Sequence, residues 1–302
     1  SRANEKRDYR IFQDFGYHLI EQVRPLFAKE RTPLIDLEET IFALDSTSIS
    51  VSINLAAWAS GKYSRGAVKM HTLLDLRGNI PTFIHISDGT WHDSNVMDYI
   101  QFESNAVYTM DKAYVDLTAL NKMDSIGAYF VTRAKSVMRY RIIETMDTNE
   151  DGILADQLVM LTGHKSSRLY PKPLRIVQYR DAETNEELTF ISNNMDISAL
   201  DIANIYRNRW QIEVFFKWIK QNMTVKRMWG YSENAVRIHL WTAIISYLLM
   251  AKIKANLQTE YSITEVARIL GVSALAKTPI RELLAKDQPT IENQNVKELK
   301  LF

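Results

Sequence analysis

Residues 206–220 read YRNRWQIEVFFKWIK, a run that predicts a helix with one polar stripe. Tyr206, Glu213 and Lys220 are spaced seven apart, so on one continuous helix each lies about 20° from the last. Arg209 follows Tyr206 by three positions and joins the same stripe. A single carboxylate among cations is stabilised as its anion, which makes Glu213 a poor general acid but a good metal ligand. The neighbouring cations suit the binding of phosphates.

The ordinary interpretation of such a stripe is a solvated helix face with ion pairs between turns, to which Lys217 also contributes. Two acids elsewhere in the chain favour a site instead. Asp45 is the single acid in the stretch 41–51, IFALDSTSISV, which reads as a strand. A carboxylate in a core strand is costly unless it is paired or bound to metal.

Asp111 directly follows the short apolar strand 106–110. Open α/β sheets place their sites at the carboxyl ends of strands. Taken singly, Asp45 or Asp111 is more often a cap of a helix or turn than a ligand. Together with Glu213 they form an acid triad of hard oxygen ligands, which is what phosphoryl transfer with two metal ions requires.

The spacing Tyr-x2-Arg-x3-Glu-x6-Lys within 206–220 resembles the signature of the bacterial insertion-sequence transposases of family four, which are cut-and-paste DDE enzymes. Residues 45–47, Asp-Ser-Thr, match the context of that family's first acid. Residues 111–114, Asp-Lys-Ala-Tyr, match its second, Asp-Arg-Gly-Tyr, at the ends only. His-Asp-Ser at 92–94 and the stretch 130–135 also resemble this family.

The resemblance covers residues 40–260 and implies a DNA transposase. Such an enzyme cleaves strands at the transposon ends and transfers them into target DNA, with a hairpin intermediate and a homodimer on the DNA. Asp45, Asp111 and Glu213 are then expected to hold two Mg²⁺ or Mn²⁺ ions. The side chains expected to contact DNA are Tyr206, Arg209, Lys217, Lys220, Lys112, Arg133 and Lys135.

The hairpin step in this family uses an aromatic side chain, typically Trp, against a flipped base. Candidates here are Tyr140, Tyr170 and Tyr179, although an aromatic in a strand is more often a packing residue. Two other functions stay open at this point: a ribonuclease H-like nuclease without strand transfer, and a catalytically inactive DNA-binding derivative. Separate assays for cleavage, its metal dependence and strand transfer distinguish them.

The strand and helix patterns predict an α/β fold of ribonuclease H-like order, βββαβαβ, with a mixed sheet flanked by helices. The strands are expected at 41–51, 68–76, 80–86, 106–110 and 128–132, and the helices at 93–100 and 117–126. Four more strands, at 139–145, 157–161, 174–179 and 188–192, predict a β-rich insertion. One helix from Ser198 to Met223 and another over 233–257 follow.

This pattern divides the chain into four parts. Residues 1–40 form a helical N-terminal segment, 41–132 with 193–225 the catalytic domain, 133–192 the insertion, and 226–302 a C-terminal helical region. Because the chain begins at Ser1, we expect that a DNA-end-binding region preceded it. Residues 262–272 look like the start of a helix-turn-helix, but Pro279 breaks the second helix, which favours a packing or dimer helix.

Composition fits a large globular domain, and the resemblance implies a bacterial cytoplasmic protein that associates with the nucleoid when it acts. The 302 residues are 46% hydrophobic, without a run of eighteen apolar residues, so no membrane span is expected. The absence of Cys excludes disulfides, thiolate catalysis and cysteine zinc sites. Net charge is only +1, but residues 201–260 carry nine basic against four acidic side chains, an excess that suits a phosphate backbone.

Overall fold

A computed structural model of the chain describes residues 2–33, 35–50, 67–222, 232–273 and 277–284. The chain separates into two compact units, Ser1–Leu249 and Met250–Phe302. Residues 58–66 are predicted to form a loop because they contain Gly61, Ser64 and Gly66. This loop and the predicted end of a helix at Met223 lie outside the described residues.

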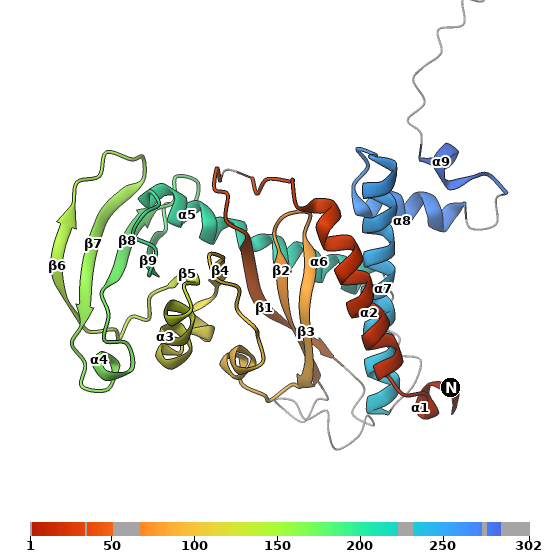
Figure 1. The fold of residues 1–302 in the computed structure, drawn as a ribbon, viewed down its shortest axis with the longest axis horizontal. Coiled ribbons are helices and arrows are strands. Elements are labelled where there is room, and N and C mark those ends of the chain that lie inside the picture. The colour runs from red at the N-terminus through yellow and green to blue at the C-terminus, as the bar shows by residue number, and fades with distance from the viewer. Residues whose placement is uncertain (1, 34, 51–66, 223–231, 274–276, 285–302) are drawn as a thin grey trace, which may run out of the picture. The chain divides into compact units, whose positions relative to one another are not determined.

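The first unit is organised by a nine-stranded mixed sheet with the order β3-β2-β1-β4-β5-β9-β8-β7-β6 (Figure 1). The predicted strands of the catalytic half are confirmed, and β1 pairs antiparallel with β2 and parallel with β4. Their bounds are β1 Ile41–Ser50, β2 Ala67–Asp75, β3 Ile80–Asp88, β4 Val107–Met110 and β5 Tyr129–Arg133. This is the expected ribonuclease H-like arrangement.

The hairpin between β2 and β3 shows how local sequence sets the register. Gly78 and Asn79 both have positive φ, +70° and 57°. The register pairs Asp75 with Ile80, so the four residues 76–79 connect the strands. Gly adopts positive φ without strain and Asn tolerates it, which suits both to this connection. Gly-Asn between two apolar runs predicts a hairpin from the sequence, and the structure confirms it.

The other half of the sheet is antiparallel throughout. Its strands are β6 (Tyr140–Met146), β7 (Ile153–Leu161), β8 (Leu174–Arg180) and β9 (Glu187–Ser192). Because β9 pairs with β5, residues expected to form an insertion extend the same sheet.

Short helices cover the edges and connections. The N-terminal helical region contains α1 (Arg2–Lys6), α2 (Arg10–Val23) and the 3-10 turn η1 (Arg24–Phe27). The connections hold η4 (Lys112–Tyr114), α3 (Leu117–Ser125) and α4 (Ser166–Leu169). The predicted α-helix at 93–100 is instead a 3-10 helix, η3 (Asp93–Asp98), whose hydrogen bonds join Asn95 to His92 and Tyr99 to Val96. These i to i+3 bonds make the turn tighter than an α-helix.

The single helix predicted from Ser198 is wrong, because it is broken at Arg209. The structure has α5 (Ala199–Asn208) and α6 (Trp210–Asn222). The side-chain nitrogen of Asn208, the last residue of α5, donates to the carbonyls of Asn204, at 2.9 Å, and Pro33, at 2.8 Å. Such side-chain bonds compete with the helical ladder, and the backbone around Arg209 closes i to i+3 bonds instead.

The long helix α7 (Glu233–Leu257) agrees with the predicted bounds. By length and composition it is apolar enough to cross a membrane, but 61% of its most apolar window is buried inside the structure. Trp241 is 1% exposed and its ring lies 5.2 Å from that of Tyr17. Residues 240–251 are the longest apolar stretch of the sequence and predict a buried helix, which the structure confirms for most of that stretch.

The second unit contains α8 (Ile263–Val272) and α9 (Ile280–Leu283). Ser262 and Glu265 form a reciprocal capping box that fixes the start of α8. Pro279 stands immediately before α9, which spans only four residues.

Candidate active site

The two predicted aspartates lie on neighbouring parallel strands. The register pairs Leu44 of β1 with Met110 of β4, so the next residue on each strand is an acid, Asp45 or Asp111. Their backbones are thus brought side by side by the sheet, although they are far apart in the chain. Both carboxylates accept a short hydrogen bond from the backbone N–H of the following residue, at 2.7 Å for Asp45 and 2.6 Å for Asp111.

Arg209 joins the third acid to the first. Its Nη1 donates to Asp45 Oδ2 at 2.8 Å and its Nη2 to Glu213 Oε1 at 2.9 Å. The break between α5 and α6 places this guanidinium between β1 and the first turn of α6. Tyr206 lies on the other side, with its ring centroid 5.6 Å from the guanidinium carbon, and it packs on Phe190.

The pKa of Asp45 reflects its burial and electrostatic interactions with the carboxylates of Asp111 and Glu213. Burial raises the pKa of Asp45 to about 6, against the hydrogen bond from Ser46 and the charge of Arg209, which lower it. The value of about 6 already includes smaller upward effects of the carboxylates of Glu213 and Asp111. Like charges at close range disfavour ionisation, so this is a site in which added positive charge is stabilising.

Two cavities flank the acids. One, of about 480 Å³, holds Asp45 and Glu213 together with Lys217 and Lys220. Lys217 is exposed, whereas Lys220 is partly covered and burial lowers its pKa. The stripe that the sequence predicted is therefore split between two helices, but Glu213, Lys217 and Lys220 share a cavity.

The second cavity, of about 780 Å³, contains Asp111 and the predicted cations Lys112, Arg133 and Lys135. Arg133 also pairs with Glu186 at 3.0 Å, and Lys135 donates to the carbonyl of Val115 at 2.8 Å. These two cations therefore already have partners within the chain, whereas Lys112 is exposed.

The carboxylates have the right chemistry for Mg²⁺ or Mn²⁺, which prefer hard oxygen ligands. Even so, no group of three or more His, Asp or Glu side chains in the described part of the chain is arranged to hold a metal ion. The contacts explain this, because Arg209 engages Asp45 and Glu213 at the same time.

Several other candidates are placed by the structure. Tyr170 is fully buried, with its hydroxyl donating to Asp124 at 3.0 Å, so it is a packing residue and not available to a base. Tyr140 and Tyr179 are partly exposed. His92 caps η3 by accepting from the N–H of Ser94, as the more frequent role of such a residue predicts.

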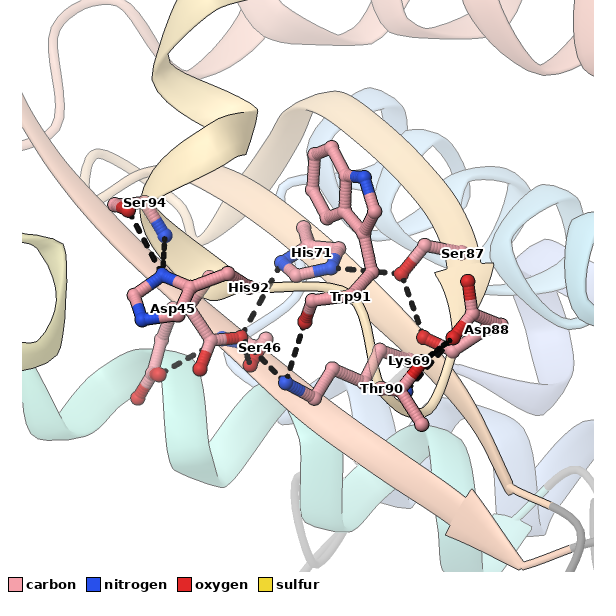
Figure 2. Close-up of polar contacts among 11 residues, drawn as sticks. Asp45, Ser46, Lys69, His71, Ser87, Asp88, Thr90, Trp91, His92 and Ser94 are labelled. Atoms are coloured by element: carbon pink, nitrogen blue, oxygen red, sulfur yellow. Dashed lines mark hydrogen bonds and ion pairs between the residues drawn. The ribbon is translucent and has the colours of Figure 1, made fainter. Parts of the chain in front are cut away.

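Sequence reasoning missed a fourth acid, Asp93, which contacts Ser46 directly. Figure 2 shows Ser46 beside Asp45, with Lys69 and His71 nearby. The only signal in the sequence is the stretch His-Asp-Ser at 92–94, in which a role is predicted for His92 but not for Asp93.

Known proteins are similar to this chain in sequence. The family model described as a transposase DDE domain matches residues 36–249. A putative transposase, y4zB, of Sinorhizobium fredii is 31% identical over 253 residues, which span 82% of this chain and 68% of that protein. The probable transposase for insertion sequence element IS5377 of Geobacillus stearothermophilus is 30% identical over 210 residues, 68% of this chain and 55% of that protein.

The putative transposase for insertion sequence element IS4SA of Synechocystis is 28% identical over 257 residues, 83% of this chain and 69% of that protein. Among solved structures, a piggyBac transposase in a synaptic complex with hairpin DNA aligns with a TM-score of 0.44 and 11% identity. That alignment covers 85% of this chain and 60% of the other. The match of the family model over most of the chain shows that this protein belongs to the transposase DDE domain family.

Proposed function

We propose that this chain is a DNA transposase that cleaves transposon ends and joins them to target DNA, with Asp45, Asp111 and Glu213 as its catalytic acids. One observation carries the proposal: neighbouring parallel strands present Asp45 and Asp111, and Arg209 links Asp45 to Glu213. The chemistry that two bound Mg²⁺ or Mn²⁺ ions supply is activation of water or a 3′-hydroxyl and stabilisation of the leaving oxygen.

The cations in the two cavities are proposed to hold the DNA backbone on either side of the acids. Lys217 and Lys220 lie in the cavity of Asp45 and Glu213, and Lys112, Arg133 and Lys135 lie in that of Asp111. Contacts to phosphates fix the register of the DNA without reading its sequence. In this role the cations place a phosphodiester between the carboxylates.

Arg209 is proposed to exchange partners when DNA binds. In the structure its two terminal nitrogens are used by the two carboxylates that are expected to bind metal. Guanidinium groups also bind phosphate oxygens strongly. A phosphate that draws Arg209 away leaves Asp45 and Glu213 free. Tyr206, whose ring lies beside Arg209, is proposed to contact the same phosphate.

Finer features rest on the resemblance and the spacing at 206–220. They are membership of insertion-sequence family four, a hairpin intermediate, a homodimer on DNA, and action in the bacterial cytoplasm at the nucleoid. The division into an N-terminal segment (1–40), a catalytic domain (41–132 and 193–225), an insertion (133–192) and a C-terminal region (226–302) belongs to the same proposal. The bacterial insertion-sequence relatives support the setting.

The test uses Asp111→Asn with a duplex that carries the terminal repeat of the element, in Mg²⁺ or Mn²⁺. The variant is expected to bind this DNA as the wild type does, with cleavage lowered at least about 10³-fold. Asp147→Asn removes an exposed acid from the loop after β6 and serves as the matched control. An Asp111→Asn protein that still cleaves would overturn the assignment.

Strand transfer is measured separately with a precut end and a target plasmid. Joined product is expected for the wild type. Metal-dependent cleavage without joining would identify a ribonuclease H-like nuclease instead.

A further inference from the structure

Asp93, at the first position of η3, meets two donors from the catalytic sheet. The Ser46 hydroxyl donates to Asp93 Oδ1 at 2.8 Å, and Lys69 Nζ donates to the same oxygen at 3.2 Å. Lys69 also donates to the Trp91 carbonyl at 2.9 Å. The side chains of Asp93 and Lys69 are only 25% and 17% exposed, so water screens this pair weakly.

Ser46 connects this contact to Asp45. Its backbone N–H donates to Asp45 Oδ1 at 2.7 Å, while its hydroxyl donates to Asp93. Both donors of Ser46 are therefore committed, one to each carboxylate. Figure 2 shows Ser46 between Asp45 and the group of Lys69 and His71. A change at Asp93 therefore reaches Asp45 through one residue.

His71 lies close to the Asp93 carboxylate but does not donate a hydrogen bond to it. The Ser87 hydroxyl donates to the Asp88 carbonyl at 3.0 Å and lies 3.1 Å from His71 Nε2, which assigns the ring proton to Nε2. His71 Nδ1 then presents a lone pair, 3.7 Å from Asp93 Oδ1, too far for a hydrogen bond. The ring is fully buried, and burial lowers its pKa to about 4, so it adds no positive charge near neutral pH.

From these contacts we infer that Asp93 is a positioning residue of the site. Asp93 holds the Ser46 hydroxyl with help from Lys69, and Ser46 in turn fixes the orientation of the Asp45 carboxylate. The inference rests on the proposed function, in which Asp45 is a metal ligand. Hydrogen bonds that orient a ligating carboxylate affect metal affinity although they do not touch the metal.

The experiment measures Mn²⁺ affinity of the full chain without DNA, by electron paramagnetic resonance titration up to millimolar Mn²⁺, together with thermal unfolding. Asp93→Ala is expected to weaken Mn²⁺ binding about 10- to 100-fold, with an unfolding midpoint close to that of the wild type. Asp93→Asn keeps an acceptor for Ser46 and is expected to recover much of the affinity. Asp98→Ala removes an exposed acid from the same 3-10 helix and is the matched control.

Ser46→Ala removes the same hydrogen bond from the other side and carries the same expectation, even if Asp93→Ala fails to fold. In a double-mutant cycle the two losses are expected to be far from additive, because they break one contact. Additive losses, or an Asp93→Ala protein that binds Mn²⁺ as Asp98→Ala does, would overturn the inference.

Asp45→Asn separates this inference from the proposed function. If Asp45→Asn weakens Mn²⁺ binding while Asp93→Ala and Ser46→Ala do not, the positioning role is wrong and the metal site stands. If Asp45→Asn binds Mn²⁺ as the wild type does, the proposed metal role of Asp45 fails and the positioning role fails with it.

Discussion

Two arginines, Arg175 of β8 and Arg209 between α5 and α6, are held very differently. Arg175 of β8 forms two hydrogen bonds to Asp156 of β7, at 2.8 and 2.6 Å, with both side chains about 5% exposed. Its Nη1 also donates to the carbonyl of Ile197 at 2.6 Å. Arg209 divides its donors between Asp45 and Glu213, and its Nε is buried without a partner among the described atoms.

The difference distinguishes a fixed contact from an exchangeable one. We call the Arg175–Asp156 pair closed, because both side chains are almost fully buried. The bond from Arg175 to the Ile197 carbonyl also holds the residue just before Ser198, the cap of α5. Neither partner has room for another ligand. Glu213 is 35% exposed and Asp45 20%, so the carboxylates of Arg209 are open to competitors. The ion pair of Arg175 is therefore suited to holding structure in place, whereas the contacts of Arg209 can be exchanged for other ligands.

The largest effect is expected where the closed pair is broken. Asp156→Asn leaves the Arg175 charge buried and is expected to lower the free energy of unfolding by about 3–5 kcal/mol, measured by urea denaturation. Glu187→Gln breaks the exposed pair with Arg180 and is expected to cost less than about 1 kcal/mol. Equal losses in the two variants would erase the distinction between the closed pair and a surface contact.

A smaller effect is expected from pH, which acts on the catalytic half through His71. The folded-state pKa is about 4 against an ordinary 6.5, because burial and the charges of His85 and Lys69 outweigh the attraction of Asp93. Between these values the unfolded chain binds more protons, so stability falls as pH drops from 6.5 towards 4. From pH 7 to 5 the loss is expected to be about 2 kcal/mol.

The measurement compares urea unfolding of the wild type and His71→Gln at the two pH values. The variant lacks the titrating ring and is expected to lose less stability on acidification, while the other groups titrate in both proteins. An identical loss in both proteins would show that His71 does not couple the catalytic half to pH.

The smallest effect is expected at the open pair. Arg209→Gln removes the competitor for Asp45 and Glu213, so Mn²⁺ affinity without DNA is expected to rise about tenfold, equivalent to about 1.4 kcal/mol. Arg207→Gln, which breaks an exposed pair with Glu183, is the neighbouring control. Unchanged affinity in Arg209→Gln would mean that this arginine is as fixed as Arg175.

Much of the fold can be predicted from local sequence patterns. The Gly78-Asn79 turn, the alternating strands and the cap at Ser198 depend on residues close in the chain, and the structure has them where they were predicted. The break at Arg209 was missed because it depends on a contact from Asn208 to the distant Pro33. No periodicity in residues 206–220 reveals that contact.

The site divides in the same way. Asp45 and Asp111 stand out in sequence because acids are rare in apolar strands, and the parallel register then brings them together. Their catalytic role stays a prediction. Asp93 carries no such signal, since its importance depends on where η3 lies against Ser46 and Lys69, which only the folded chain determines.

The placement of β6–β9 between β5 and α5 also sets an order of synthesis. The ribosome synthesises Asp45 and Asp111 before β6–β9, and Glu213 only after β9, the strand that pairs with β5. A nascent or prematurely terminated chain that stops within this region has two of the three proposed acids and the cations of Lys112, Arg133 and Lys135. Under the proposed function such a fragment lacks Glu213 and is expected not to cut DNA, so incomplete translation products would not act as stray nucleases.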